Sequence, residues 1–118
     1  MGQQLANTHR GEIAAGFEGR QWTLCLTLGG LAELESHFGA SGLSDLTEKL
    51  AARPLAARDL IAILTAGLRG GGHDLTAEDV AELRHEKGTA GFASVAAELL
   101  QATFAVPAIE PEGGSRGG

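Results

Sequence analysis

The sequence contains no tyrosine, one tryptophan and one cysteine, and each of these shortages narrows what the protein can be. With four phenylalanines as the other aromatic residues, the core has to be built mainly from aliphatic side chains, which bury less apolar area each. The single Cys25 cannot form an internal disulfide, so the chain suits a reducing compartment. No apolar run approaches the roughly 18 residues of a membrane-spanning helix, and residues 1–10 lack the apolar region of a signal peptide. We therefore expect a cytoplasmic protein with no membrane contact.

Positive charge is also scarce. Nine Lys and Arg residues stand against fifteen Asp and Glu residues, which gives a net charge of −6. The basic residues are scattered singly from Arg10 to Arg116 and form no stripe. Because affinity for nucleic acid comes mainly from clustered Lys and Arg, this pattern predicts that the chain does not bind nucleic acid.

Residues 11–28 have the alternating pattern of a β-hairpin. On each predicted strand every second residue is apolar, which creates one apolar face. These residues are Ile13, Ala15 and Phe17 on the first strand and Trp22, Leu24, Leu26 and Leu28 on the second. Between the strands, Gly19 supplies the positive φ of a tight turn. A two-stranded hairpin is marginal alone in water, so helices must cover its apolar face.

The rest of the chain shows helical spacing of apolar residues in five stretches. They are residues 31–39, 44–53, 55–69, 77–87 and 91–104. Gly39 is expected to end the first helix and Ser44 to cap the second. Thr76 and Asp79 have the spacing of a capping box before the fourth helix, and His85 in its last turn is expected to complement the helix dipole. The predicted fold class is therefore α+β, mainly α, with an N-terminal β-hairpin packed against about five short helices.

The chain divides into one domain and two ends. Residues 9–106 hold all the predicted elements and are expected to form a single α+β domain. Residues 1–8 are predicted to be a flexible N-terminus. Residues 107–118 hold two prolines, four glycines and little apolar surface, so we expect this tail to be disordered.

Two of the predicted helices carry more apolar surface than one face requires. In residues 55–69 the apolar positions cover most of the helix, and in residues 91–104 the polar residues form one thin line. Such helices lie either at the centre of a fold or against a partner. The candidate partner-binding residues are Leu60, Ile63, Leu64, Leu68, Val95, Leu99, Leu100 and Phe104.

Three consecutive glycines, Gly70 to Gly72, precede His73 and Asp74. The segment does not fit a phosphate-binding loop, because it follows a helix and no Lys-Ser or Lys-Thr comes after it. We interpret it as a corner in which Gly70 takes the left-handed conformation that ends a helix. A small anion-binding or enzymatic domain that uses Gly70–Gly72 stays open as an alternative.

The sequence offers no arrangement for catalysis or for holding a metal or cofactor. The histidines do not stand in ligand pairs, and Cys25 lies between two leucines without a basic neighbour. The acidic pairs Glu33/Glu35 and Glu78/Asp79 point in different directions on their helices. We therefore predict no catalytic, cofactor-binding or metal-binding residues and no enzymatic activity.

Three segments carry a resemblance to a known family. Residues 9–13 read HRGEI, residues 22–35 read WTLCLTLGGLAELE, and residues 57–80 read ARDLIAILTAGLRGGGHDLTAEDV. The chain resembles the small tail proteins of gene transfer agents and related phages, a group that includes tail assembly chaperones and tail tube proteins. The resemblance covers nearly all of the predicted domain, and its most specific part is the run LTAGLRGGGHD at residues 64–74.

The resemblance implies a non-enzymatic role in building a phage-like tail, in the bacterial cytoplasm or within the tail itself. The leading hypothesis is a tail assembly chaperone that binds the tape-measure or tube protein through apolar helix faces. The alternative is a structural subunit of the tail tube or connector, whose hairpin pairs edge to edge with its neighbours. Self-association into a homo-oligomer is left open. One departure from the family is Ala56, where a Ser or Thr cap is expected, and it predicts a helix start that frays.

Overall fold

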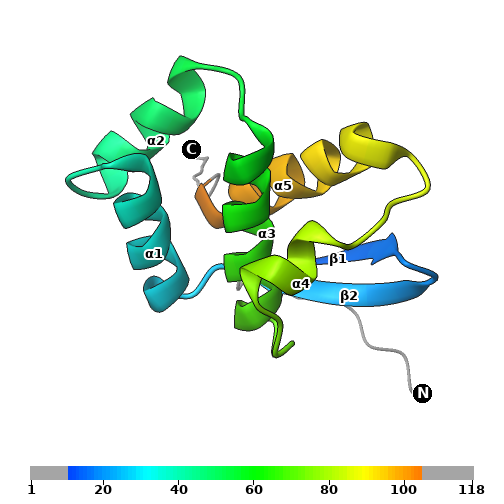
Figure 1. Cartoon of the computed structure of the whole chain (residues 1–118). Helices are drawn as coiled ribbons and strands as arrows, with labels where there is room; N and C mark the ends of the chain where they lie inside the picture. Colours follow the sequence, from blue (N-terminus) through cyan, green and yellow to red (C-terminus); the bar gives the residue numbers. More distant parts are fainter. Residues whose placement is uncertain (1–10, 105–118) are drawn as a thin grey trace, which may run out of the picture.

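A computed structural model describes residues 11–104, which adopt the predicted α+β, mainly helical arrangement. In chain order the elements are β1 (Glu12–Phe17), β2 (Arg20–Cys25), α1 (Leu28–Phe38), α2 (Leu43–Ala52), α3 (Ala57–Gly70), α4 (Ala77–Ala81) and α5 (Gly88–Phe104). Figure 1 shows α3 in the middle of the molecule, with α1 and α2 on one side and the hairpin and α4 on the other. The ends predicted at residues 1–8 and 107–118 lie outside the described residues.

The hairpin forms as its sequence pattern predicts. Glu18 and Gly19 both have positive φ and make a two-residue turn, so that Phe17 pairs with Arg20. The alternating apolar residues of both strands are buried, and the rings of Phe17 and Trp22 stack with their centroids 5.2 Å apart.

The second strand is shorter than predicted. β2 ends at Cys25, whereas Leu28, expected on the apolar face of the strand, begins α1 and is 81% exposed. The cause is Thr27, whose side chain accepts a hydrogen bond from the Gly30 N–H at 3.0 Å and so caps α1. At the other end Gly39, with φ of 67°, stops α1 as predicted.

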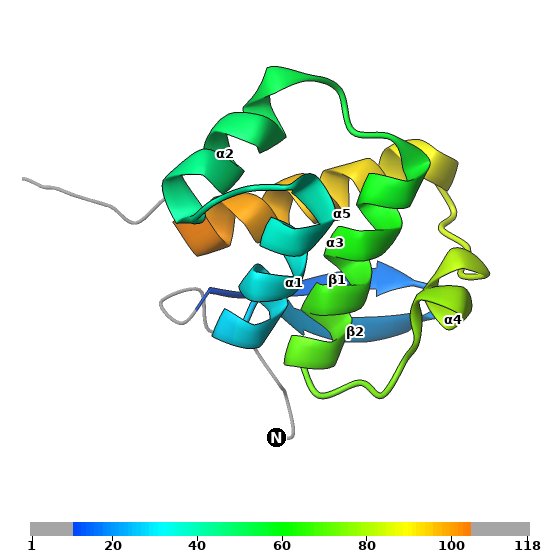
Figure 2. The same ribbon diagram turned by 60° about the vertical axis from the view of Figure 1, so that its left-hand side comes forward.

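Helix α3 lies at the centre of the fold, as its wide apolar surface predicts. It packs against β2, α1, α4 and α5, while α5 also packs against β1. Together α3 and α5 cover the apolar face of the hairpin (Figure 2). The most deeply buried apolar side chains are Leu24, Leu34, Leu46, Ile63, Leu68 and Leu99. Most of the apolar surface of α3 and α5 is therefore buried within the chain.

The end of α3 crosses the backbone of β2 at short range, and this contact depends on glycine. A Cβ on Gly70 would lie 2.9 Å from the carbonyl carbon of Cys25, and one on Gly71 would lie 2.6 Å from that of Thr23. The prediction of a left-handed Gly70 is wrong, because α3 continues through that residue and the positive φ of 97° belongs to Gly72. Gly70 and Gly71 are needed for the close approach, and Gly72 for the corner.

The start of α2 differs from the prediction. Ser44 lies inside the helix and Gly42 occupies the cap position, so the assignment of Ser44 as the cap is wrong. No side chain caps α2, but Asp45 ties it to the preceding loop, because its Oδ2 accepts a hydrogen bond from the Ser41 N–H at 2.9 Å and its Oδ1 lies 3.6 Å from Lys49 Nζ. The hydrogen bond from the Ser41 backbone and the charge of Lys49 lower the pKa of Asp45.

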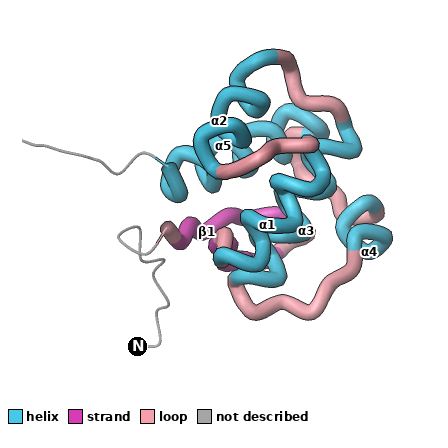
Figure 3. The backbone as a smooth tube through the Cα atoms, turned by 90° about the vertical axis from the view of Figure 1, so that its left-hand side faces the viewer, coloured by secondary structure: helices cyan, strands magenta, loops and turns pink. Residues whose placement is uncertain are grey.

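Helix α4 is much shorter than the predicted helix of residues 77–87, and it stands to one side of α3 (Figure 3). The capping box is confirmed, because the Thr76 hydroxyl accepts from the Asp79 N–H at 3.1 Å and Asp79 Oδ2 accepts from the Thr76 N–H at 3.0 Å. The helix nevertheless ends at Ala81.

The prediction that His85 lies in the last turn of a helix is therefore wrong. His85 lies in the loop between α4 and α5, where its ring packs 6.2 Å from the Phe17 ring and 5.4 Å from the Phe92 ring. The backbone of Gly91 leaves room for it, since a Cβ there would overlap the imidazole. The loop is thus held by an aromatic cluster between the hairpin and α5.

The two outer edges of the hairpin differ. In the register set by the turn, the backbone groups of every second residue point away from the partner strand. On β2, the outward carbonyls of Thr23 and Cys25 are covered by the end of α3, and the Thr23 N–H donates to His73 Nε2 at 3.4 Å. On β1, the outward residues Ala14 and Gly16 are exposed, and no backbone hydrogen bond from elsewhere in residues 11–104 reaches them.

Candidate functional site

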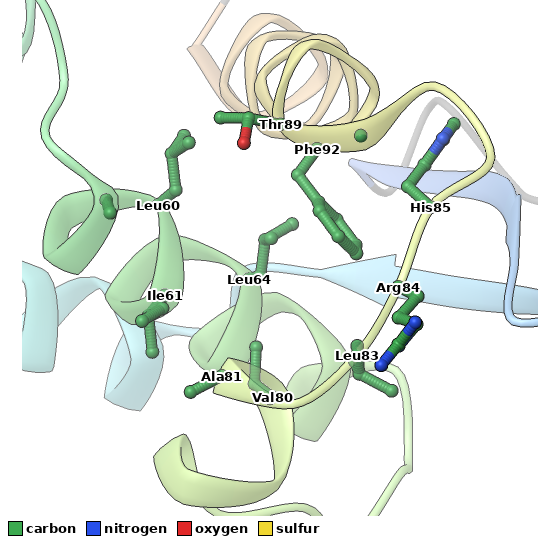
Figure 4. A pocket seen from close by; sticks show the side chains of 12 residues that line it. Leu60, Ile61, Leu64, Val80, Ala81, Leu83, Arg84, His85, Thr89 and Phe92 are labelled. Carbon is green, nitrogen blue, oxygen red and sulfur yellow. The ribbon is translucent and has the colours of Figure 1, made fainter.

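An apolar groove opens between α3, α4 and the first turns of α5. Figure 4 shows Leu60 and Leu64 on α3 facing Thr89 and Phe92 on α5 across it. The apolar part of the lining is formed mainly by Leu60, Ile61, Leu64, Val80, Leu83 and Phe92. The groove has a volume of about 420 Å³, which is within the range of sites that enclose small ligands or anchoring side chains.

The groove exists because α4 ends early and does not close against α5. Val80 packs into the core at 4% exposed and fixes α4 on α3, while Leu83 on the following loop stays half-buried. Phe92 is held from behind by the Phe17 ring, with centroids 5.3 Å apart. One wall of the groove is therefore packed against the core, and the loop after α4 forms the other.

Arg84 and His85 form the polar rim of the groove. The Arg84 N–H donates to Glu18 Oε2 at 2.7 Å, which ties the loop to the hairpin turn. His85 Nδ1 accepts from the Lys87 N–H at 3.0 Å. No acidic side chain lines the groove, although the chain has a net charge of −6. Within an acidic protein this surface is apolar with a basic rim.

The eight residues predicted to contact a partner lie in three places. Six of them are buried in the core, and two of these six, Leu60 and Leu64, also line the groove at 8% and 3% exposed. The other two, Leu100 and Phe104, are half-buried further along α5. Ile63, Leu68, Val95 and Leu99 are at most 5% exposed and do not line the groove. Of the eight predicted residues, those with surface left on α3 and α5 lie at the groove and further along α5.

Sequence reasoning missed four groove residues: Ile61, Val80, Leu83 and Phe92. Val80 and Leu83 carried a signal, because they have the i, i+3 spacing of an apolar helix face. That signal predicted burial and not a groove, since it assumed a helix through residue 87.

The triple-glycine corner lacks the features of an anion site. The N–H groups of Gly71, Gly72 and His73 donate to carbonyl oxygens of α3 at 2.9, 3.1 and 2.9 Å. The corner also lies at the C-terminal end of α3, where the helix dipole is negative and repels anions. Because an anion would need free N–H groups at a helix N-terminus, the corner is a structural feature.

A buried carboxylate, Asp59, holds the start of α3. Its Oδ2 accepts from the Ala56 N–H at 2.8 Å and lies 2.9 Å from Arg53 Nη1, and its Oδ1 lies 2.8 Å from His37 Nε2. Burial alone would raise the pKa of Asp59, but these partners outweigh burial and hold the pKa far below its usual value. Ala56 provides no side-chain cap, as the sequence indicates, but Asp59 holds the backbone of Ala56 at the start of α3. The cluster links α1, α3 and the loop after α2.

The remaining candidate residues do not form a reactive site. Among residues 11–104, no three His, Cys, Asp or Glu side chains stand close enough to hold a metal ion. Asp79 is used in the capping box, and His73 contacts the Trp22 ring edge on, with centroids 4.9 Å apart. Cys25 is half-buried on β2, and His9 lies outside the described residues. No helix in this part of the chain is long and apolar enough to cross a bilayer.

These features define a small α+β protein whose described surface presents an apolar groove and no cluster of reactive groups. Residues 10–106 match a family model described as phage tail tube protein, GTA-gp10, and the chain belongs to this family. The resemblance noted in the sequence is confirmed, and the protein is a component of phage or gene-transfer-agent tail systems. No curated protein and no solved structure matches the chain.

Proposed function

We propose that the chain acts without catalysis as a tail assembly chaperone, and that it binds an apolar helix of the tape-measure or tube protein in the groove between α3, α4 and α5. The observation that carries the proposal is the groove itself, which is built from three helices and lined mainly by aliphatic and aromatic side chains. An amphipathic helix that lays its apolar face into such a groove is a common mode of peptide recognition.

The rest of the described surface supports transient binding over permanent assembly. The large apolar side chains exposed on residues 11–104 are Leu28 at 81% and Leu43 at 44%, and they lie on different helices. Permanent subunit interfaces bury about 2,000 Å² or more and are rich in apolar side chains. A surface with one apolar groove and two isolated leucines fits a single bound segment better than several fixed neighbours.

The proposal is tested by co-expressing the full chain with the tape-measure and tube proteins of the same tail system. Leu83→Glu places a charge in the groove wall, and we expect it to weaken the complex at least about tenfold, since a charge would have to be buried against apolar atoms. Affinity is measured by titration calorimetry or by recovery of the complex.

Leu28→Glu is the matched control, because it makes the same change on an exposed leucine outside the groove. It is expected to leave binding within about twofold of the unmodified chain. Circular dichroism and Trp22 fluorescence establish that both variants fold. The proposal would be refuted if Leu83→Glu and Leu28→Glu weakened binding equally. It would also be refuted if the unmodified chain bound neither the tape-measure protein nor the tube protein.

A second candidate function is a structural subunit of the tail tube, and the exposed β1 edge favours it. The outward backbone groups of Ala14 and Gly16 receive no backbone hydrogen bond from residues 11–104, and such groups can pair with a strand from another molecule. Mass spectrometry of purified particles separates the two functions. A chaperone is absent from finished tails, whereas a tube subunit is present there in many copies.

A further inference from the structure

The groove carries a permanent positive charge at one of its ends, the guanidinium of Arg84. The other titratable group of its lining is His85, and no carboxylate lines it. Figure 4 shows Arg84 beside Leu83 on the loop after α4, at the opposite end of the groove from Leu60 and Thr89. The groove is therefore asymmetric, with a cation at one end and an uncharged hydroxyl at the other.

The backbone that carries Arg84 is held in place from two directions. The Arg84 N–H donates to Glu18 Oε2 at 2.7 Å, which fixes this residue to the hairpin turn. The ring of the next residue, His85, packs against the rings of Phe17 and Phe92. The exposed side chain of Arg84 is therefore presented at a defined place on the rim.

Within residues 11–104, no acidic side chain pairs with the Arg84 guanidinium. The cations Arg53 and Lys49 form ion pairs with carboxylates of the chain, and Arg20 stacks over the Trp22 ring at 4.0 Å. The Arg84 guanidinium makes no such contact with the described residues, although the chain has six more acidic than basic side chains. Its charge is left for a group from outside this part of the chain.

The acidic side chains near Arg84 do not line the groove. Glu18 and Glu86 line a separate hollow beside the hairpin turn, and Glu18 already accepts from the Arg84 N–H. A carboxylate at the groove end would meet Arg84 next to apolar atoms, where water screens an ion pair less than on an open surface. A basic residue at the same place would bring two like charges together, which is unfavourable.

We propose that the helix bound in the groove carries an Asp or Glu at the end that meets Arg84. Its carboxylate pairs with the guanidinium, while its apolar face contacts Leu60, Leu64 and Phe92. This inference rests on the proposed function and adds to it the charge and the direction of the bound segment. Because the cation lies at one end of the groove, a helix that is acidic at one end binds in one orientation. Charge pairs at the rim of an interface act mainly on specificity in this way.

The test uses two labelled amphipathic peptides that share leucines at positions i, i+3, i+4 and i+7 and differ in carrying glutamates or lysines at one end. Binding to the full chain is measured by fluorescence anisotropy in about 0.15 M salt, where charges more than about 8 Å apart are largely screened. We expect the glutamate peptide to bind at least about fivefold more tightly, although the net charge of −6 by itself favours the lysine peptide.

Two substitutions of Arg84 assign this preference to one side chain. Arg84→Glu is expected to reverse the preference, and Arg84→Lys, which keeps the charge, is expected to retain its direction. Because Arg84 is exposed, both variants should fold, and circular dichroism establishes that they do. Arg69→Glu is the matched control, since it makes the same change of charge on an exposed arginine at the end of α3, outside the groove. It is expected to leave the preference within about twofold.

Three results would overturn the inference. The first is equal binding of the two peptides, and the second is the same preference in Arg84→Glu as in the unmodified chain. The third is peptide affinity that falls as the protein concentration rises, since a second copy of the chain would then occupy the groove.

The tail proteins separate this inference from the proposed function. If a tape-measure or tube protein bound the chain and Leu83→Glu weakened this binding whereas Arg84→Glu did not, the proposed function would stand and the inference would be wrong. Charge-dependent binding of the peptides, with no binding of either tail protein, would sustain the charge preference of the groove and refute the proposed function.

Discussion

Replacing Gly71 with alanine is the most direct test of how α3 meets the hairpin. The new Cβ would lie 2.6 Å from the carbonyl carbon of Thr23 and closer still to its oxygen. Both atoms belong to the backbone of a strand that is hydrogen-bonded to β1, so they cannot rotate away. The end of α3 would have to move off β2, and the packing of Leu68 and Leu24 would loosen with it.

The expected cost follows from this geometry. Overpacking of a core costs about 1–3 kcal/mol when side chains can adjust. Here the obstacle is backbone, so we expect a loss of about 3 kcal/mol in the free energy of unfolding. For a domain of this size, such a loss corresponds to a fall in Tm of roughly 10–20 °C.

Urea unfolding followed by Trp22 fluorescence measures the loss, because Trp22 is the single tryptophan and is buried on β2. Gly29→Ala is the matched control. Gly29 lies in the first turn of α1 with only the Thr27 hydroxyl near its Cβ position, at 3.8 Å. Alanine there should stabilise the helix by about 0.5 kcal/mol, because it restricts the unfolded chain. If Gly71→Ala and Gly29→Ala changed stability by similar amounts, the close approach of α3 to β2 would be wrong.

Two further predictions concern the helix starts. Asp59→Asn removes the buried charge that holds Ala56, Arg53 and His37 and is expected to cost about 2 kcal/mol at pH 7 in urea unfolding, as charged hydrogen bonds do. Because the pKa of Asp59 is lowered in the folded protein, the stabilisation that its charge provides is present above about pH 4 and is lost as the pH falls further. The unmodified chain should therefore lose stability on acidification more steeply than Asp59→Asn. Parallel curves of stability against pH for the two proteins would contradict this. Thr76→Ala removes the cap of α4 and is expected to destabilise this helix by about 1 kcal/mol. Amide hydrogen exchange in α4 should then be about fivefold faster, whereas Thr76→Ser, which keeps the hydroxyl, should retain the protection.

The elements that were predictable from the sequence are those whose signals are local. The hairpin follows from strict alternation on both sides of Gly19, and α1 ends at Gly39 because glycine accepts a positive φ. The capping box of Thr76 and Asp79 is likewise a contact between neighbours in sequence. In each case the residues that determine the structure lie within one turn of each other.

The errors arose where distant residues compete with local preference. Residues 82–87 have helix-forming side chains, yet Glu18 binds the backbone of Arg84 and the aromatic cluster holds His85. Tertiary contacts of this kind override helix propensity. Ala56 looked like a missing cap because its substitute, Asp59, depends on Arg53 and His37 from other elements.

The candidate site was predictable in kind but not in position. The excess of apolar residues on the third and fifth helices was visible in the sequence, and it indicated either a central place or a partner. Periodicity gives no information about how far α5 stands from α3, and that separation creates the groove. Leu60 and Leu64 were therefore found, whereas Leu83 was not, since it borders the groove only because α4 stops at Ala81.

The unequal edges of the hairpin restrict how copies of the chain could combine through their strands. Within residues 11–104, α3 covers β2 at Thr23 and Cys25, so addition at β1 uses the side of the hairpin that these residues leave uncovered. Two molecules joined in this way form a closed pair about a twofold axis, and neither has a strand left for a third. A ring or stack of many subunits would need a separate contact on the helical side of the molecule.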